Sequence, residues 1–151
     1  MFEIGDKAPD FELLNSKEVP VKLSDFLGKR VVLFFYPRAG TSGCTTQACG
    51  FRDNFPTFEA ANATVVGVSP DEPAALAKWI EKENLPYTLL SDPDHRVADQ
   101  YGVWGEKSMY GRKYMGIIRS HFVIDAEGKF EDIQVKVSPK NSVARALTTI
   151  T

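Results

Sequence analysis

The chain has 151 residues, a length that suits one domain with one substantial core, and we expect a single domain over residues 1–151. Its 18 Lys and Arg residues nearly balance 20 Asp and Glu residues, for a formal net charge of −2. This balance gives no basic surface for nucleic acid or for an anionic membrane. The expected partner is therefore a small molecule or another protein.

The sequence also lacks the patterns of a membrane protein. The longest apolar run, residues 31–36, is far too short to span a bilayer. The first residues, MFEIGD, have no charged segment followed by an apolar stretch, which a signal peptide would need. For the residues given, we expect a cytoplasmic protein that does not bind a membrane.

The first half of the chain alternates strand and helix patterns. Residues 30–36 (RVVLFFY) and 64–68 (TVVGV) are apolar and β-branched runs, which predict strands covered on both faces. Between them, residues 43–55 can form a helix, and residues 71–83 predict another, with Pro73 near its start. This β-α-β-α order is typical of a parallel sheet.

The second half predicts a short helix, a hairpin and a last helix. The short helix opens at Asp92-Pro93 and ends at Gly102, with Val97 and Tyr101 facing inward. Residues 118–124 and 129–137 flank a turn and predict an antiparallel pair. The last helix begins near Ser138.

Together these elements predict an α/β fold, a three-layer sandwich with a mixed central β-sheet flanked by helices. Ligands in such sheets gather beyond the carboxyl ends of the parallel strands. Residues 37–44 (PRAGTSGC) lie at such an end, and we expect the functional site there.

Cys44 falls in the first turn of the helix that follows the buried strand. Free N–H groups and the positive end of the helix dipole stabilise a thiolate at this position. On a helix, Cys44 shares one stripe with Ala48, Phe51 and Phe55, so we expect its side chain to point toward the core.

Cys49 points elsewhere on the same helix. Five residues on an ideal helix give about 140° of rotation and about 7.5 Å of rise, which places the two Cα atoms roughly 8.7 Å apart. Bridged Cα atoms are usually less than about 7 Å apart. A Cys44–Cys49 disulfide therefore requires the helix to unwind, which the weak helix formers Thr45, Thr46 and Gly50 make easier.

Spacing alone leaves other interpretations of the two cysteines open. Both can be small buried hydrophobes, which is the commoner fate of free cysteine. A metal site is disfavoured, because the pair has only His95 and His121, far away in sequence, as further ligands of a familiar zinc set.

Residues 35–37 (FYP) and 41–53 (TSGCTTQACGFRD) resemble the peroxiredoxins, specifically the bacterioferritin-comigratory or peroxiredoxin Q branch. The resemblance continues through residues 5–11, 89–92, 101–107 and 119–125, nearly the whole chain. It implies a thioredoxin-like fold, hydrogen peroxide or an organic hydroperoxide as substrate, and no metal or organic cofactor.

The family motif of Pro, three residues, Thr, two residues and Cys is met by Pro37, Thr41 and Cys44, and the distant arginine of the family corresponds to Arg119. By this resemblance Cys44 attacks the peroxide, Thr41 orients it, and Pro37 shields the sulfur. Arg119 holds the thiolate and a peroxide oxygen with its planar donors. Without the resemblance, Thr41 is typical of a helix N-cap and Arg119 of a solvated strand residue.

The resemblance further implies a catalytic cycle. Attack yields a sulfenic acid on Cys44, and Cys49 condenses with it to form an intramolecular disulfide. Thioredoxin or glutaredoxin then reduces the disulfide. Many relatives of this branch are monomers, so a monomer is expected.

Two residues depart from the family pattern. Ser42 stands where proline is usual, which loosens the entry to the helix, and His121 stands where a small hydroxyl residue is usual. His121 shares a strand face with Arg119, so it either tunes activity near neutral pH or is merely structural. We expect His95 on the surface.

Three other functions are alternatives to a thiol peroxidase. A hydrolase or transferase would use Cys44 with His121 as its base. A redox sensor would use the Cys44–Cys49 switch without turnover. A plain disulfide reductase is disfavoured, because four residues separate the cysteines instead of two.

Overall fold

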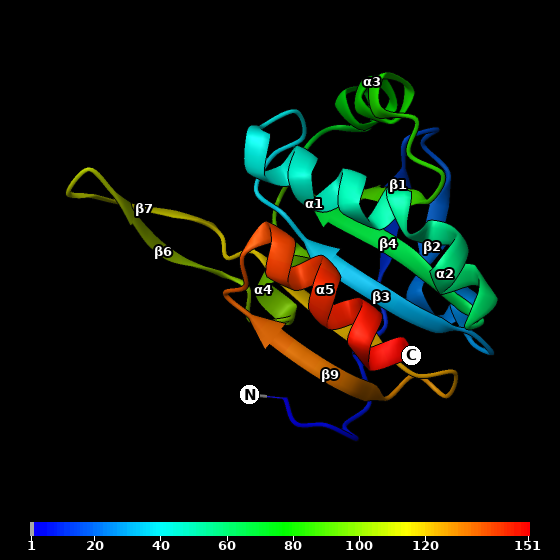
Figure 1. Cartoon of the computed structure of the whole chain (residues 1–151). Coiled ribbons are helices and arrows are strands. Elements are labelled where there is room, and N and C mark those ends of the chain that lie inside the picture. The colour runs from blue at the N-terminus through cyan, green and yellow to red at the C-terminus, as the bar shows by residue number, and fades with distance from the viewer. Residues whose placement is uncertain (1) are drawn as a thin grey trace.

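A seven-stranded mixed sheet runs through the middle of the molecule in the computed structural model, which describes residues 2–151 (Figure 1). The strand order is β2-β1-β5-β4-β3-β8-β9. The strands are β1 (Glu12–Asn15), β2 (Pro20–Lys22), β3 (Arg30–Phe35), β4 (Ala63–Ser69), β5 (Thr88–Ser91), β8 (Ser120–Ile124) and β9 (Phe130–Val135).

The centre of the sheet is parallel, as the two apolar runs predict. β3 pairs with β4, and β4 with β5, in parallel, whereas β8 runs antiparallel to β3 and to β9. Side chains on both faces of β3 are buried, because a layer of helices or loops covers each face. The carboxyl ends of β3 and β4 therefore meet at one edge, where the loop after β3 begins.

Helices α1 (Ser42–Asp53), α2 (Phe55–Ala60), α3 (Pro73–Glu83) and α5 (Pro139–Ile150) cover one face of the sheet (Figure 1). Their buried side chains, such as Phe51, Leu76 and Ala146, form one apolar cluster with β3 and β4. A second cluster, which includes Phe11 and Tyr101, covers the other face beside α4 (Arg96–Gln100) and the 3-10 helix Leu23–Phe26. The predicted three-layer α/β sandwich is confirmed.

Two helix boundaries differ from the sequence prediction. The expected helix over residues 43–55 is two helices, because Asn54 stands between α1 and α2 and its side chain donates to the carbonyl of Gly50. The third helix begins at Arg96 and not at Asp92. The Asp92 carboxylate instead accepts hydrogen bonds from the backbone of Val97 and Ala98, so it caps the helix from outside.

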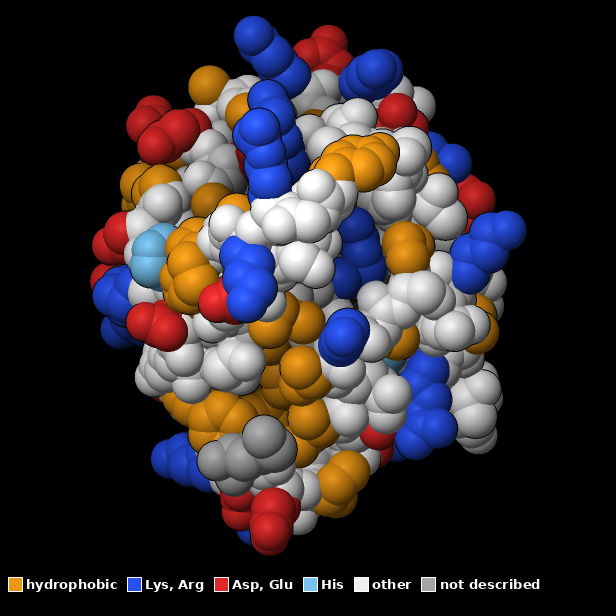
Figure 2. Space-filling model, turned by 90° about the vertical axis from the view of Figure 1, so that its left-hand side faces the viewer, with side chains coloured by type: hydrophobic (Ala, Val, Ile, Leu, Met, Phe, Trp, Pro, Cys, Tyr) orange, Lys and Arg blue, Asp and Glu red, His pale blue; other side chains and the backbone are white. Residues whose placement is uncertain are grey.

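The sequence analysis missed a two-stranded hairpin that projects from the body, formed by β6 (Trp104–Met109) and β7 (Arg112–Ile117) (Figure 1). Tyr110 and Gly111 both have positive φ at its tip, as a tight hairpin turn requires. Basic side chains gather on the face of the molecule from which it projects (Figure 2). Within residues 2–151, every helix is too short or too polar to cross a bilayer.

Candidate active site

Cys44 lies at the edge of the sheet where β3 ends and α1 begins. Cys44 is the third residue of α1 and is fully buried. Thr41 is the N-cap residue of α1, and its carbonyl accepts the first helical hydrogen bond, from Thr45. Cys44 therefore sits in the first turn, as the sequence predicts, where free N–H groups favour a negative charge.

The loop that leads into α1 is fixed by Asp71, a residue that the sequence analysis did not single out. The Asp71 carboxylate accepts a hydrogen bond of 2.8 Å from the backbone N–H of Ala39 and one of 2.7 Å from the hydroxyl of Ser69. Because Ser69 ends β4, this contact ties the loop to the neighbouring strand. The entry to α1 is thus held even though Ser42 replaces the usual proline.

Arg119 is the residue before β8, and its side chain contacts the sulfur of Cys44. Its Nη2 donates a hydrogen bond of 3.2 Å to Sγ of Cys44, and its Nη1 donates one of 2.7 Å to Oε1 of Gln47. The guanidinium can approach so closely because Gly43 has no side chain; a Cβ there would lie 3.2 Å from Nη2. A cation that donates to sulfur stabilises the thiolate form of Cys44.

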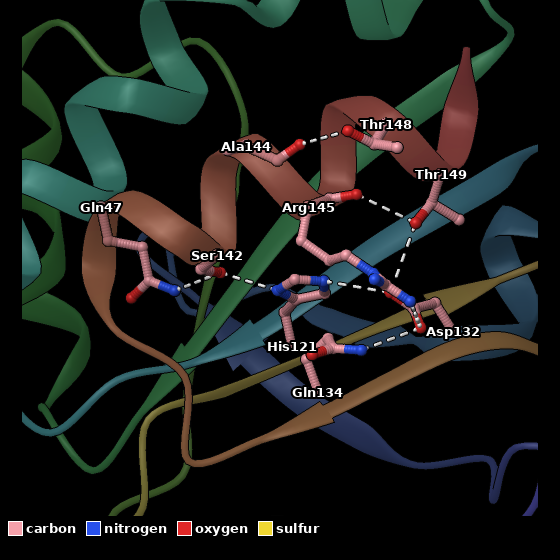
Figure 3. Close-up of polar contacts among 9 residues, drawn as sticks. All are labelled: Gln47, His121, Asp132, Gln134, Ser142, Ala144, Arg145, Thr148 and Thr149. Atoms are coloured by element: carbon pink, nitrogen blue, oxygen red, sulfur yellow. Dashed lines mark hydrogen bonds and ion pairs between the residues drawn. The ribbon is translucent and has the colours of Figure 1, made fainter.

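A buried chain of hydrogen bonds continues from Arg119 to Gln47. From Gln47 it runs to Ser142 and His121 (Figure 3). Nε2 of Gln47 donates 2.9 Å to the Ser142 hydroxyl, which lies 2.7 Å from Nδ1 of His121. Nε2 of His121 faces the Asp132 carboxylate at 3.8 Å, too far for a hydrogen bond. Gln47, Ser142 and His121 are fully buried, so this chain of hydrogen bonds links the candidate active site to the interface between α5 and β8.

His121 is neutral at physiological pH in this setting. Burial lowers its pKa to about 4, although the nearby Asp132 carboxylate acts in the opposite direction. Ser142 accepts a hydrogen bond from Gln47 and shares another with Nδ1 of His121. The buried, neutral imidazole favours the structural role of His121 over the tuning of activity near neutral pH. Cys44 contacts Arg119, and His121 contacts Ser142.

The other predicted residues lie around the same loop. Pro37 is half-buried, and the exposed Thr41 donates its hydroxyl to the carbonyl of Arg38 at 2.9 Å. Their action on a peroxide stays a prediction. His95, expected on the surface, is half-buried and stacks on Trp104 with ring centroids 3.7 Å apart.

Cys49 lies one and a half turns further along α1, and both cysteines are free. It is half-buried, and its thiol donates a hydrogen bond of 3.3 Å to Oε2 of Glu83. Burial and this hydrogen bond raise the pKa of the Cys49 thiol. Among residues 2–151, no group of three or more His, Cys, Asp or Glu side chains is placed to hold a metal ion.

Arg119 also lines a cavity of about 580 Å³. Lys107 and Lys136 also line it, so three cations face this space against one carboxylate, Glu106. Burial lowers the pKa of Lys107, and the positive charge of Arg119 lowers it further. Arg119 thus lines a positively charged cavity and also contacts the buried sulfur of Cys44.

Comparison with known proteins gives a consistent result. The sequence model of the AhpC/TSA family matches residues 4–133. The chain is 49% identical to peroxiredoxin Bcp of Bacillus subtilis over 148 residues, which cover 98% of this chain and 94% of that one.

Two solved structures have the same fold. Peroxidoxin BcpB from Mycobacterium tuberculosis superposes with a TM-score of 0.88 at 39% identity, covering 99% of this chain and 97% of that one. A bacterioferritin comigratory protein of Xanthomonas campestris, described with alkyl peroxide reduction activity, gives a TM-score of 0.87 at 30% identity, covering 93% and 89%.

Proposed function

The chain belongs to the AhpC/TSA family, in the Bcp or peroxiredoxin Q branch of its thiol peroxidases, and we propose that Cys44 attacks the peroxide and Cys49 resolves the product. The single observation that carries this assignment is the 3.2 Å contact between the Arg119 guanidinium and the Cys44 sulfur at the start of α1. A helix N-terminus and a guanidinium both favour the anionic sulfur, and only the thiolate is an effective nucleophile.

In the first step, the Cys44 thiolate attacks one oxygen of the O–O bond. A sulfenic acid forms on Cys44, and water or an alcohol leaves after it takes up a proton. Arg119 has N–H donors in its plane beyond those that contact Cys44 and Gln47, so it can stabilise the charge that develops on the departing oxygen. Thr41 orients the peroxide, and Pro37 shields the sulfur from water.

In the second step, Cys49 condenses with the Cys44 sulfenic acid to form a disulfide. Both residues lie on the unbroken helix α1, whose geometry keeps their Cα atoms roughly 8.7 Å apart. The first turns of α1 must therefore unwind before the bond forms. This makes the enzyme an atypical two-cysteine peroxiredoxin with an intramolecular disulfide.

The remaining steps rest on the family resemblance. Thioredoxin or glutaredoxin reduces the disulfide, the protein acts as a cytoplasmic monomer of one domain, and it needs no cofactor. Organic hydroperoxides are included as substrates because the Xanthomonas relative is described as reducing alkyl peroxides. The cavity beside Arg119 offers space for an organic group next to the reacting oxygen.

A steady-state assay of peroxide consumption with thioredoxin tests the proposal. Cys44→Ser should abolish consumption of both hydrogen peroxide and an alkyl hydroperoxide. Cys49→Ser should still consume one equivalent of peroxide and accumulate a sulfenic acid, which mass spectrometry detects after trapping. Full turnover by Cys49→Ser with thioredoxin would contradict the role of Cys49, and activity of Cys44→Ser would contradict the whole assignment.

A further inference from the structure

The Glu83 carboxylate is placed against the sulfur of Cys49. Glu83 is the last residue of α3, and its Oε2 lies 3.3 Å from Cys49 Sγ and 3.8 Å from Nη1 of Arg52. The tighter contacts of Arg52 go elsewhere, to the backbone carbonyl of Glu83 at 2.7 Å and to the Asp53 carboxylate at 3.0 Å. The thiol is therefore the nearer partner of the Glu83 carboxylate.

The contact with Glu83 affects the protonation state of the Cys49 thiol. The groups that face Cys49 are Arg52 and Asp53 on α1, Glu83 on α3 and the phenol of Tyr87. Burial and the Glu83 carboxylate outweigh the cation and keep Cys49 protonated near neutral pH. A protonated thiol is a poor nucleophile, so Cys49 must lose its proton as it attacks.

The half of α1 that carries Cys49 is anchored more firmly than the first turn. The phenol of Tyr87 donates 2.6 Å to the carbonyl of Ala48, Arg52 is bonded to the end of α3, and Phe51 is fully buried. The first turn has the exposed residues Thr41 and Ser42. When α1 unwinds, we expect the turn with Cys44 to move while Cys49 stays beside Glu83.

We propose that Glu83 is the general base of the resolving step, a role that rests on the proposed function of Cys44 and Cys49. Sγ of Cys49 attacks Sγ of the Cys44 sulfenic acid, so the S–S bond forms as the S–O bond breaks. The thiol proton passes to Oε2 of Glu83, the departing hydroxide is protonated to water, and Glu83 returns its proton to solvent. The Cys49 sulfur is oxidised and the Cys44 sulfur is reduced by the same electron pair.

The test is a single-turnover experiment on Glu83→Gln, which keeps the size of the side chain and a hydrogen-bond acceptor but not the basic carboxylate. The reduced protein is mixed with one equivalent of hydrogen peroxide, quenched at intervals and analysed by mass spectrometry for sulfenic acid and disulfide. General-base catalysis typically contributes 10² to 10⁴-fold. We expect disulfide formation to slow by about 100-fold at neutral pH while sulfenic acid formation keeps its rate. Glu81→Gln, a neighbouring exposed carboxylate on α3, is the matched control and should behave as wild type.

The pH profile separates a base from a structural contact. In wild type, the rate of disulfide formation should be flat between about pH 6 and pH 8, because the Cys49 thiol, whose pKa is raised, passes its proton directly to the adjacent carboxylate. In Glu83→Gln it should rise about tenfold per pH unit, since only the spontaneously ionised thiol reacts. An equal rate and a flat profile in both proteins would overturn the role of Glu83 alone. Absence of any Cys44–Cys49 disulfide in wild type would instead overturn the proposed function.

Discussion

Nη1 of Arg119 donates a hydrogen bond of 2.7 Å to Oε1 of Gln47, a residue 72 positions away in the chain. The other amide atom of Gln47 donates to Ser142, so the amide cannot rotate without losing both contacts. Because Gln47 fixes Nη1 in this way, Nη2 of the planar guanidinium is directed at the sulfur of Cys44. Gln47 thus orients the guanidinium that contacts the sulfur of Cys44, the nucleophile of the proposed function.

Replacing Gln47 by Leu should lower the second-order rate constant for hydrogen peroxide by about 10-fold. The variant removes the hydrogen bond that Arg119 donates to Gln47. A hydrogen bond to a charged group contributes about 1.5–3 kcal/mol, and only part of this free energy stabilises the transition state. Arg119→Met should cost about 100-fold or more, because the donor itself is lost. Stopped-flow peroxide kinetics measure both, and Arg112→Met on the exposed strand β7 controls for the loss of one positive charge.

Adding Gln47→Leu to Arg119→Met should then change the rate little, because the two residues act as one unit. Additive losses in the double variant would show that Gln47 acts on Cys44 by another route.

Gly43→Ala should reduce activity without reducing stability. The new Cβ would lie 3.2 Å from Nη2 of Arg119, and this guanidinium is held on its other side by Gln47, so the atom nearest Cys44 must move. Alanine favours a helix over glycine by up to about 1 kcal/mol. We expect the rate with peroxide to fall about 10-fold while the denaturation midpoint stays equal or rises. Ser42→Ala, at the neighbouring exposed position, should leave both quantities near wild type.

Stabilising α1 should slow the resolving step. Thr46 is exposed and bonds its hydroxyl back to the carbonyl of Ser42, so Thr46→Ala raises helix propensity by about 0.5 kcal/mol without touching the core. If unwinding precedes disulfide formation, the rate of disulfide formation should fall about 2-fold, and more Cys44 should become sulfinic acid at high peroxide. Thr148→Ala removes the same type of contact from the exposed face of α5. It should change neither the rate of disulfide formation nor the yield of sulfinic acid. A faster disulfide in Thr46→Ala would contradict unwinding of this turn.

The strands and the place of Cys44 in the fold were predictable because they depend on local pattern. The apolar runs over β3 and β4 and the position of Cys44 after a buried strand follow from adjacent residues. Arg119 was found only through the family resemblance, since nothing near it in sequence points to Cys44.

Residues that act through long-range polar contacts could not be predicted. Ser142 meets Gln47 across 95 positions, and Glu83 meets Cys49 across 34, so only the packing of α5 and α3 on α1 brings them together. The β6–β7 hairpin was missed for a different reason. Its strands lie outside the core and carry mostly polar, exposed residues, so they lack the apolar alternation that predicts a strand.

The buried imidazole of His121 should make the protein less stable in mild acid. Its pKa is about 4 in the folded chain because of burial, against an ordinary value near 6.5 when unfolded. Below about pH 6.5 the unfolded chain therefore binds a proton that the folded chain does not, and the free energy of unfolding falls as pH falls. The shift corresponds to about 3 kcal/mol, lost by about pH 4.

Chemical denaturation between pH 7 and pH 4 measures this loss. His121→Ser, which restores the small hydroxyl residue usual in the family, should flatten the profile over that window, whatever its stability at pH 7. Because His121 reaches Arg119 through Ser142 and Gln47, acid that protonates it should also disturb the site. An identical slope in His121→Ser and wild type would show that His121 is not the group that titrates.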